Sequence, residues 1–258
     1  MGIRGVTPTV DEPTAAILVI GDEVLGARVT DVNSTFLCRR LSELGVAVKR
    51  VVVVPDEVPV IAAEVAACAA GFTHVITTGG VGPTHDDVTM ESVAKGFGMA
   101  LKRHPEAEAA IRAFYGADMN EAALRMADLP EGAQLIMTPA MRFPVIRVEN
   151  LWVFPGSPHL LKKKFEMVAG HFASTPFITE TLCVNTGEPD IAPFLGEVQT
   201  RFPGAAIGSY PQEPGTPFRL MITVKGKNGE VVAATAAALR EGLAEWTVEP
   251  PTGWSPDG

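Results

Sequence analysis

Short apolar runs alternate with amphipathic stretches through the first half of the chain. Each run is rich in Val, Ile or Ala and stops at Gly or at Pro-Asp, as expected of strands that are covered on both faces. The predicted strands lie at 15–21, 46–56 and 73–80. Helices are predicted between and after them, at 31–45, 57–71 and 88–98. This alternation predicts a doubly wound, mostly parallel sheet in a Rossmann-like three-layer α/β fold.

The pattern then becomes less regular without leaving this fold class. Residues 104–130 are alanine-rich and charged, and they predict one or two helices in an excursion from the sheet. Three further strands are predicted at 133–137, 144–150 and 151–158. Glu149-Asn150 suits a hairpin turn between the last two, and a helix is expected at 159–173.

The last part of the chain follows a different order of elements. It reads β-α-β-β-α-β, which predicts a second, smaller ferredoxin-like α+β domain. Both ends combine Pro, Gly and charge with no periodic apolar pattern, so flexible tails are expected there. The expected parts are a tail at 1–14, the α/β domain at 15–174, the small domain at 175–250 and a tail at 251–258.

Bulk composition narrows the classes of function. The 258 residues are 47% hydrophobic and 20% charged, as in an ordinary globular protein. A net charge of −9 and a pI of about 5.1 argue against binding to nucleic acid or to an anionic membrane. The three cysteines show no CxxC spacing, so neither a disulfide framework nor a zinc site is predicted. Without a secretory leader or a long uncharged apolar stretch, the protein is expected to be cytoplasmic.

Three loops are predicted at the carboxyl edge of the parallel sheet, where open α/β sheets bind ligands. They are GDEVLG at 21–26, TGGVGPTHDD at 78–87 and PGSP at 155–158. In the middle loop, Gly79, Gly80 and Gly82 can take positive φ and expose successive N–H groups to an anion. Asp86 and Asp87 would repel a bound phosphate unless a divalent cation bridged the carboxylate and phosphate oxygens.

The first loop and the residues after it add further polar groups. Asp22 and Glu23 supply a second carboxylate pair, and Asp31, Asn33 and Ser34 follow as a hydrogen-bonding set. Three such loops at one sheet edge favour a binding site over three unrelated turns. The spacing is neither GxxxxGK[ST] nor GxGxxG, which argues against a Walker-type ATPase and a standard dinucleotide site.

Each feature also has a purely structural interpretation, which the sequence leaves open. Gly-rich strand ends are common, and Asp86 or Asp87 would suit the N-cap of a helix that begins near Val88. His85 fits either a ligand contact or a surface turn. The run Lys162–Lys164 is expected to be a solvated helix face rather than a phosphate clamp.

The segments GDEVLGARVTDVNSTFLCRRLSELG, TTGGVGPTHDDVT and WVFPGSP resemble the molybdopterin-binding (MoCF-biosynthesis) domain family. Within it, the chain is similar to the CinA N-terminal branch. RFPVIRVENLWVFPGSPHLL and VVPDEVPVIAAEV resemble more closely the N-terminal molybdopterin-binding-type domain of eukaryotic FAD synthase. The similarity covers about residues 15–250 and implies a MogA/MoaB-like α/β domain followed by a small α+β domain.

The resemblance also implies an activity, a pyrophosphatase acting on FAD or ADP-ribose with a divalent metal (Co²⁺, Mn²⁺ or Mg²⁺) and K⁺. By position, the phosphate site would be lined by Thr78, Gly79, Gly80, Gly82, Pro83 and Thr84. The metal and the attacking water would be held by Asp86, Asp87 and Glu23. Further ligand contacts would come from Asp22, Asn33, Gly156 and Ser157. Relatives of this fold form dimers or trimers, so a homo-oligomer is expected.

The chain departs from the family pattern at several points. No NMN-deamidase or nucleotidyltransferase segment is recognisable, so neither of those activities is expected. The GTAPG-type loop of bacterial relatives is replaced by TPAMRFPVI, and His85 stands where molybdenum-cofactor enzymes carry arginine. Both departures weaken the expectation of pterin binding.

Three functions follow from these patterns, all with a nucleotide or pterin as the small-molecule ligand. The leading one is hydrolysis of a nucleotide pyrophosphate such as FAD or ADP-ribose, with release of AMP. The second is molybdopterin binding or adenylylation in molybdenum cofactor biosynthesis. The third is a non-catalytic nucleotide-binding module.

Overall fold

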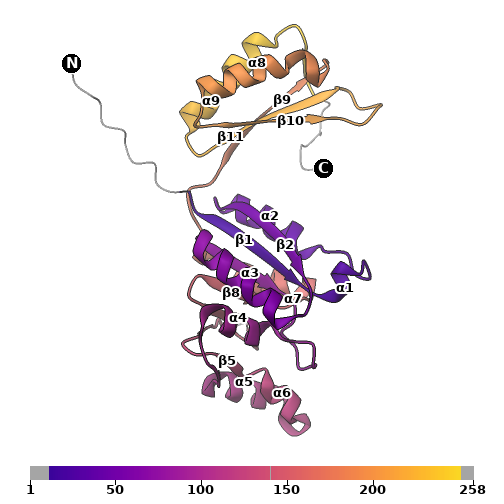
Figure 1. The fold of residues 1–258 in the computed structure, drawn as a ribbon. Coiled ribbons are helices and arrows are strands. Elements are labelled where there is room, and N and C mark those ends of the chain that lie inside the picture. Colours follow the sequence, from indigo (N-terminus) through magenta and orange to yellow (C-terminus); the bar gives the residue numbers. More distant parts are fainter. Residues whose placement is uncertain (1–11, 140, 251–258) are drawn as a thin grey trace, which may run out of the picture. The chain divides into compact units, whose positions relative to one another are not determined.

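The computed structural model describes residues 12–139 and 141–250. They form two compact units that divide between Ser174 and Thr175, and each unit is described by itself (Figure 1). The predicted tail at 251–258, and the first eleven residues of the tail predicted at 1–14, lie outside the described residues. Thr14 already belongs to the first strand.

A six-stranded mixed sheet forms the centre of the first unit. Its strands are β1 (Thr14–Ile20), β2 (Ala47–Val54), β3 (His74–Thr78), β6 (Gln134–Ile136), β7 (Val145–Val148) and β8 (Leu151–Phe154). In the order β2-β1-β3-β8-β7-β6, the first four strands run parallel, and β7 and β6 add antiparallel pairs. The predicted hairpin turn joins β7 to β8, with Glu149 at a φ of 52°. The mostly parallel sheet is confirmed.

Helices cover both faces of this sheet because the central strand is apolar on both sides. The helices are α1 (Asp22–Leu25), α2 (Asn33–Glu43), α3 (Val58–Gly71), α4 (Thr89–Phe97), α7 (Pro158–Val168) and the 3-10 helix η2 (Ala169–His171). Ala16, Leu18 and Ile20 of β1 pack in one core with residues of α3 and α4. Ile17 and Val19 pack in the other core with residues of α2 and α7. The predicted doubly wound arrangement is therefore confirmed.

The excursion predicted near residues 104–130 is a small subdomain of its own. It contains β4 (Leu101–Arg103), α5 (Pro105–Tyr115), the 3-10 helix η1 (Gly116–Asp118), α6 (Glu121–Arg125) and β5 (Asp128–Pro130). β4 and β5 pair antiparallel at its base, and α5 and α6 project beyond α4 (Figure 1). Ala107 and Ile111 of α5 are buried against the first core, which fixes the subdomain to the sheet.

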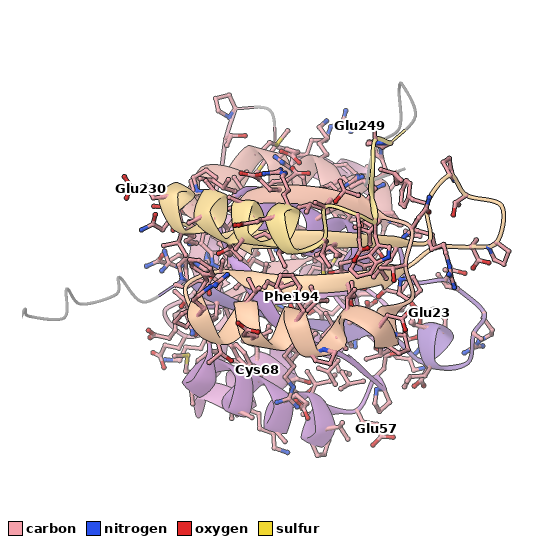
Figure 2. The ribbon with its side chains drawn as sticks, turned by 90° about the horizontal axis from the view of Figure 1, so that it is seen from above. Glu23, Glu57, Cys68, Phe194, Glu230 and Glu249 are labelled. Carbon is pink, nitrogen blue, oxygen red and sulfur yellow. The ribbon has the colours of Figure 1, made fainter. Side chains whose placement is uncertain are left out.

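The second unit is an antiparallel sheet with two helices, in the order that the sequence predicts. Its elements are β9 (Ile178–Val184), α8 (Glu188–Arg201), β10 (Ala206–Pro211), β11 (Leu220–Gly226), α9 (Gly229–Gly242) and β12 (Thr247–Val248). The strand order β10-β11-β9-β12 is that of a ferredoxin-like sheet. Phe194 of α8, labelled in Figure 2, packs against Gly242 of α9. A Cβ at position 242 would lie only 2.1 Å from the ring of Phe194. The two helices can therefore pack closely.

Candidate functional site

The carboxyl ends of the four parallel strands meet at one edge of the first unit. The loops begin at Gly21 after β1, Pro55 after β2, Gly79 after β3 and Pro155 after β8. In Figure 2, Glu23 and Glu57 lie toward one end of this unit, and Cys68, near the end of α3, lies toward the other. The three predicted loops therefore share an edge with a fourth loop that the sequence had not singled out.

Gly79 is the point at which three strand ends come together. Its φ is +105°, and a Cβ at this position would lie 2.0 Å from the carbonyl oxygen of Ile20 in β1. Its N–H donates to the carbonyl of Phe154 in β8 at 3.3 Å, and its Cα lies 3.3 Å from where a Cβ at Gly156 would be. Gly79 therefore allows the backbones to approach, and its N–H is not available to an anion as the sequence predicted.

The next three residues differ from Gly79 in their N–H groups, and of the predicted Gly80 and Gly82 only Gly80 has a positive φ. Within residues 12–139 and 141–250, the N–H groups of Gly80, Val81 and Gly82 have no hydrogen-bond partner. Thr89 holds the loop from behind, since its hydroxyl donates to the carbonyl of Gly79 at 2.8 Å and its N–H to that of Gly80 at 3.0 Å. The phosphate site at this loop stays a prediction, with the N–H groups of residues 80–82 as its candidate donors.

Asp87 closes the turn that follows the glycines. Its carboxylate accepts from the N–H of Thr84 at 2.8 Å and also from the Thr84 hydroxyl. A Cβ at Gly82 would lie 2.6 Å from the same carboxylate, so the glycine leaves room for it. Helix α4 has Val88 as its N-cap and no side-chain cap, so the helix-capping interpretation of Asp86 or Asp87 is wrong.

Asp86 belongs to the same turn, and its side chain is largely exposed to solvent. Its side chain is 61% exposed, and its Oδ1 lies 3.9 Å from Nδ1 of His85, which is 95% exposed. The Thr84 hydroxyl, the backbone N–H of Asp86 and the nearby His85 hold the pKa of Asp86 below its ordinary value. Asp86 is therefore a carboxylate at neutral pH and accessible to a ligand or water.

Asp56, which follows β2, lies at the same sheet edge and is not among the residues that the sequence predicted there. Its Oδ2 accepts from the N–H of Asp22 at 2.9 Å, and its Oδ1 lies 3.5 Å from where a Cβ at Gly80 would be. Burial raises the pKa of Asp56, and the negative charges of Asp22, Glu23 and Asp86 raise it further. Its position directly after a predicted parallel strand, in VVVVPD, could have indicated that it lies at the carboxyl edge of the sheet.

Replacing Asp56 by Asn is expected to stabilise the first unit at pH 7. A raised folded-state pKa means that the folded chain binds the proton more tightly, so stability from this group is lost as pH rises through that pKa. Asn has no charge to repel and keeps an oxygen for the N–H of Asp22. The urea midpoint should therefore rise at pH 7, with a smaller gain at pH 4. A lower midpoint at pH 7 would mean that the hydrogen bond from Asp22 outweighs the repulsion.

Asn33 and Thr78 hold the loops together, although the sequence predicted that they contact the ligand. Asn33 is buried, and its Nδ2 donates to Oγ1 of Thr78 at 3.0 Å and to the carbonyl of Gly156 at 2.7 Å. The Thr78 hydroxyl in turn donates to the carbonyl of Pro155 at 3.0 Å. These bonds join the start of α2 to the ends of β3 and β8, so both residues position the site from behind.

A cavity of about 750 Å³ opens beside the glycine loop. The loop and the end of β8 form part of its wall, and residues of the excursion, which are mainly apolar and aromatic, form another part. The charged residues that line it are Glu23, Asp87, Glu91, Arg125, Asp128 and Lys164. Its volume is in the range of pockets that enclose small organic ligands. Among the other predicted contacts, Gly80, Gly82, Thr84, Gly156 and Ser157 line the cavity, whereas Asp22, Pro83 and Asp86 are not part of its lining.

Residues 16–175 match the family described as "Probable molybdopterin binding domain". The chain belongs to this molybdopterin-binding domain family. Residues 176–252 match a second family, "FAD synthase, middle domain". The family resemblance predicted from the glycine loop and the two flanking loops is thereby confirmed.

Similar proteins come from several lineages. The chain is 32% identical to "Probable FAD synthase" of Caenorhabditis elegans, over 90% of this chain and 50% of that protein. It thus spans about half the length of the curated FAD synthases that it matches. A protein of Aeropyrum pernix is 35% identical over 91% of this chain and 90% of its own. The crystal structure of CinA from Thermoplasma acidophilum, 27% identical, covers 62% of this chain and 99% of its own with a TM-score of 0.58.

Two basic residues, Arg125 and Lys164, line the cavity of this molybdopterin-binding domain, and the sequence did not predict either of them there. Arg125 of α6 donates to the carbonyl of Pro83 at 3.0 Å, which ties the excursion to the glycine loop. Lys164 is half-buried and points away from solvent, so the prediction of a solvated lysine face is wrong at this position. The helical spacing could have indicated this, because Lys164 lies three residues after Leu161 and four before Val168 and therefore shares the face of these two buried residues.

A preformed metal centre is not present among residues 12–139 and 141–250. No group of three or more His, Cys, Asp or Glu side chains is placed there to hold a metal ion. The predicted metal set of Glu23, Asp86 and Asp87 is thus not assembled, because Asp87 is hydrogen-bonded to Thr84 and Asp86 faces solvent. Within the same residues, no helix is long and apolar enough to cross a membrane.

Proposed function

We propose that the molybdopterin-binding domain of this chain hydrolyses a nucleotide pyrophosphate such as FAD or ADP-ribose and releases AMP. The observation that carries the proposal is the position of the unpaired N–H groups of Gly80, Val81 and Gly82 beside one cavity that Glu23 and Asp87 also line. Oriented N–H groups bind phosphate oxygens, and carboxylates at the rim position water. The FAD synthase relatives support a ligand of the nucleotide class.

In the proposed step, the N–H groups of residues 80–82 hold the pyrophosphate and stabilise the charge that develops on its oxygens. The ionised Asp86 orients a water molecule, whose oxygen adds to one phosphorus while a proton passes to solvent. The anhydride P–O bond breaks, and the bridging oxygen leaves with the second phosphate. The products are AMP and FMN from FAD, or AMP and ribose 5-phosphate from ADP-ribose.

A divalent cation fits this edge together with the substrate rather than alone. Mg²⁺ and similar ions often take one or two protein carboxylates and complete their shell with phosphate oxygens and water. Glu23, Asp86 and Asp87 are the carboxylates that would hold it, and the negative charges that raise the pKa of Asp56 mean that a positive charge would be favourable there. When bound, such a cation neutralises phosphate charge and acidifies a coordinated water. Co²⁺, Mn²⁺ or Mg²⁺, the role of K⁺ and a dimeric or trimeric state remain predictions.

Incubation of the purified chain with FAD or with ADP-ribose tests the proposal directly. We expect AMP to accumulate in the presence of Co²⁺, Mn²⁺ or Mg²⁺ and to disappear when EDTA is added. Chromatography separates AMP from FMN or ribose 5-phosphate, and equal amounts of the two products show that one anhydride bond was cut. Absence of AMP with every metal, with and without K⁺, would overturn the hydrolase proposal.

The family match favours a second function, the binding or adenylylation of molybdopterin in the same cavity. The mainly apolar and aromatic wall suits a planar pterin ring as well as a nucleotide base. In the absence of AMP release, binding of a pterin would favour this function. Binding of FAD or ADP-ribose without turnover would instead favour a non-catalytic nucleotide-binding module.

A further inference from the structure

Lys164 is a half-buried cation that the proposed hydrolysis does not use. Its ammonium donates to the carbonyl oxygens of Phe143 at 3.1 Å and Pro144 at 2.7 Å. Among residues 12–139 and 141–250, no carboxylate forms an ion pair with it. An ammonium group has three donors, and the structure gives protein partners to two of them. Lys164 also lines the cavity, and its third donor has no partner among residues 12–139 and 141–250.

The cavity wall around this lysine suits a flat ring. Phe114 and Phe143 meet with ring centroids 4.7 Å apart at 61°, and Tyr115 packs on Phe114 at 5.0 Å. All three aromatic side chains line the cavity, and Phe114 is 46% exposed although it is large and apolar. Aromatic rings with a few fixed donors are the common lining of sites for planar heterocycles.

We propose that Lys164 binds a ring carbonyl oxygen of a planar heteroaromatic ligand, which is a flavin or a pterin, while the glycine loop holds the ligand's phosphate. This inference rests on the proposed function and names the class of its substrate. Lys164 offers donors and no acceptor, so its partner must be an acceptor such as a ring carbonyl. FAD carries a carbonyl-bearing ring at the far end of its pyrophosphate, whereas ADP-ribose carries a sugar there. FAD is therefore the preferred substrate of the two.

The charge state of Lys164 gives this proposal a measurable pH dependence. Burial lowers the pKa of Lys164 to about 8, so its ammonium loses a proton across a range in which flavin phosphate groups keep their charge. The other ionisable groups that line the cavity are Glu23, His85, Asp87, Glu91, Tyr115, Arg125 and Asp128. Because FMN and AMP would meet the same surrounding groups, the informative quantity is the difference between their pH profiles.

Binding of FMN, 6-hydroxymethylpterin and AMP to the full chain tests the proposal. We expect Lys164→Met to weaken the binding of FMN at least about tenfold, which is the effect of losing one charge-assisted hydrogen bond. The affinity for AMP should change less than about twofold. Lys164→Arg should recover part of the affinity because it keeps a charged donor. Lys163→Met, an exposed neighbour on the same helix, is the matched control and should bind like the wild type. Flavin fluorescence reports FMN binding, and competition reports the other two.

The outcomes separate this inference from the proposed hydrolysis. Unchanged FMN affinity in Lys164→Met, or equal weakening of FMN and AMP, would overturn the inference even if AMP is released from FAD. Lys164-dependent FMN binding without any AMP release would overturn hydrolysis and leave the ring site in place. Tighter binding of the pterin than of FMN would assign the ring to a pterin and overturn the preference for FAD.

A pH titration keeps the proposal testable if Lys164→Met does not fold. The affinity of the wild-type chain for FMN is expected to fall between pH 7 and pH 9, as the ammonium deprotonates near its pKa of about 8. AMP lacks a ring carbonyl, so its affinity should change less over the same range. Parallel profiles for FMN and AMP would overturn the role of Lys164.

Discussion

Asp86→Asn is expected to reduce AMP release from FAD at least about a hundredfold without a measurable change in stability. Asp86 is 61% exposed and accepts no hydrogen bond from outside its own turn, so the fold does not depend on its charge. The proposed water or substrate-borne cation does depend on it, because the amide cannot replace a carboxylate as an anionic ligand. Asp118→Asn, an exposed aspartate of the excursion, is the matched control and should keep the wild-type rate.

Asp87→Asn removes the charge of a second carboxylate in the same loop while keeping an oxygen that can accept hydrogen bonds. The carboxylate of Asp87 accepts two hydrogen bonds from Thr84, and an amide oxygen can keep at least one of them. We therefore expect turnover to fall as in Asp86→Asn, together with a small decrease of the urea midpoint. If both variants keep the wild-type rate of AMP release, the assignment of the site to this loop is wrong. If only Asp87→Asn slows AMP release, Asp87 is required for turnover and Asp86 is not.

The sequence predicted well those features that depend on chain periodicity. The continuous apolar run of β1 required helices on both faces of the sheet. The carboxyl-edge rule then placed the glycine loop and the PGSP loop beside each other. The structure agrees with that placement, because a Cβ at Gly156 would lie only 3.3 Å from the Cα of Gly79. Such positions follow from the topology alone, because parallel strands must end at the same edge.

The individual roles within the site were less predictable because they depend on side-chain partners distant in sequence. Asn33 looked like a ligand contact, but its amide bonds to Gly156, 123 residues later. Lys164 belonged to a run of three lysines, and only the structure shows which of them turns toward the carbonyls of Phe143 and Pro144. Asp56 was passed over because a single aspartate after a strand is common. Its importance comes from three carboxylates that other loops bring close to it.

Gly79→Ala is expected to be the most damaging small substitution in the first unit. A methyl group there would lie 2.0 Å from the carbonyl oxygen of Ile20, far inside van der Waals contact, and the φ of +105° is itself unfavourable for alanine. Neither atom can move without separating β1 from β3, which are paired over five residues. We expect the free energy of unfolding to fall by roughly 3 kcal/mol or more, and nucleotide binding to be lost with it.

Gly98→Ala provides the control for the backbone conformation alone. Gly98 has a φ of +66° at the end of α4, and a Cβ there would have no neighbour within 4 Å, so only the left-handed backbone is penalised, at about 1 kcal/mol. Hydrogen exchange measured by peptide mass spectrometry locates each effect, since exchange should accelerate in β1 and β3 for Gly79→Ala and stay unchanged in β9 and β11. Equal destabilisation by the two substitutions would mean that the close contact of Gly79 with β1 does not hold the loop. In that case the N–H groups of residues 80–82 must owe their orientation to Thr89, whose two hydrogen bonds to the loop are then the next to remove.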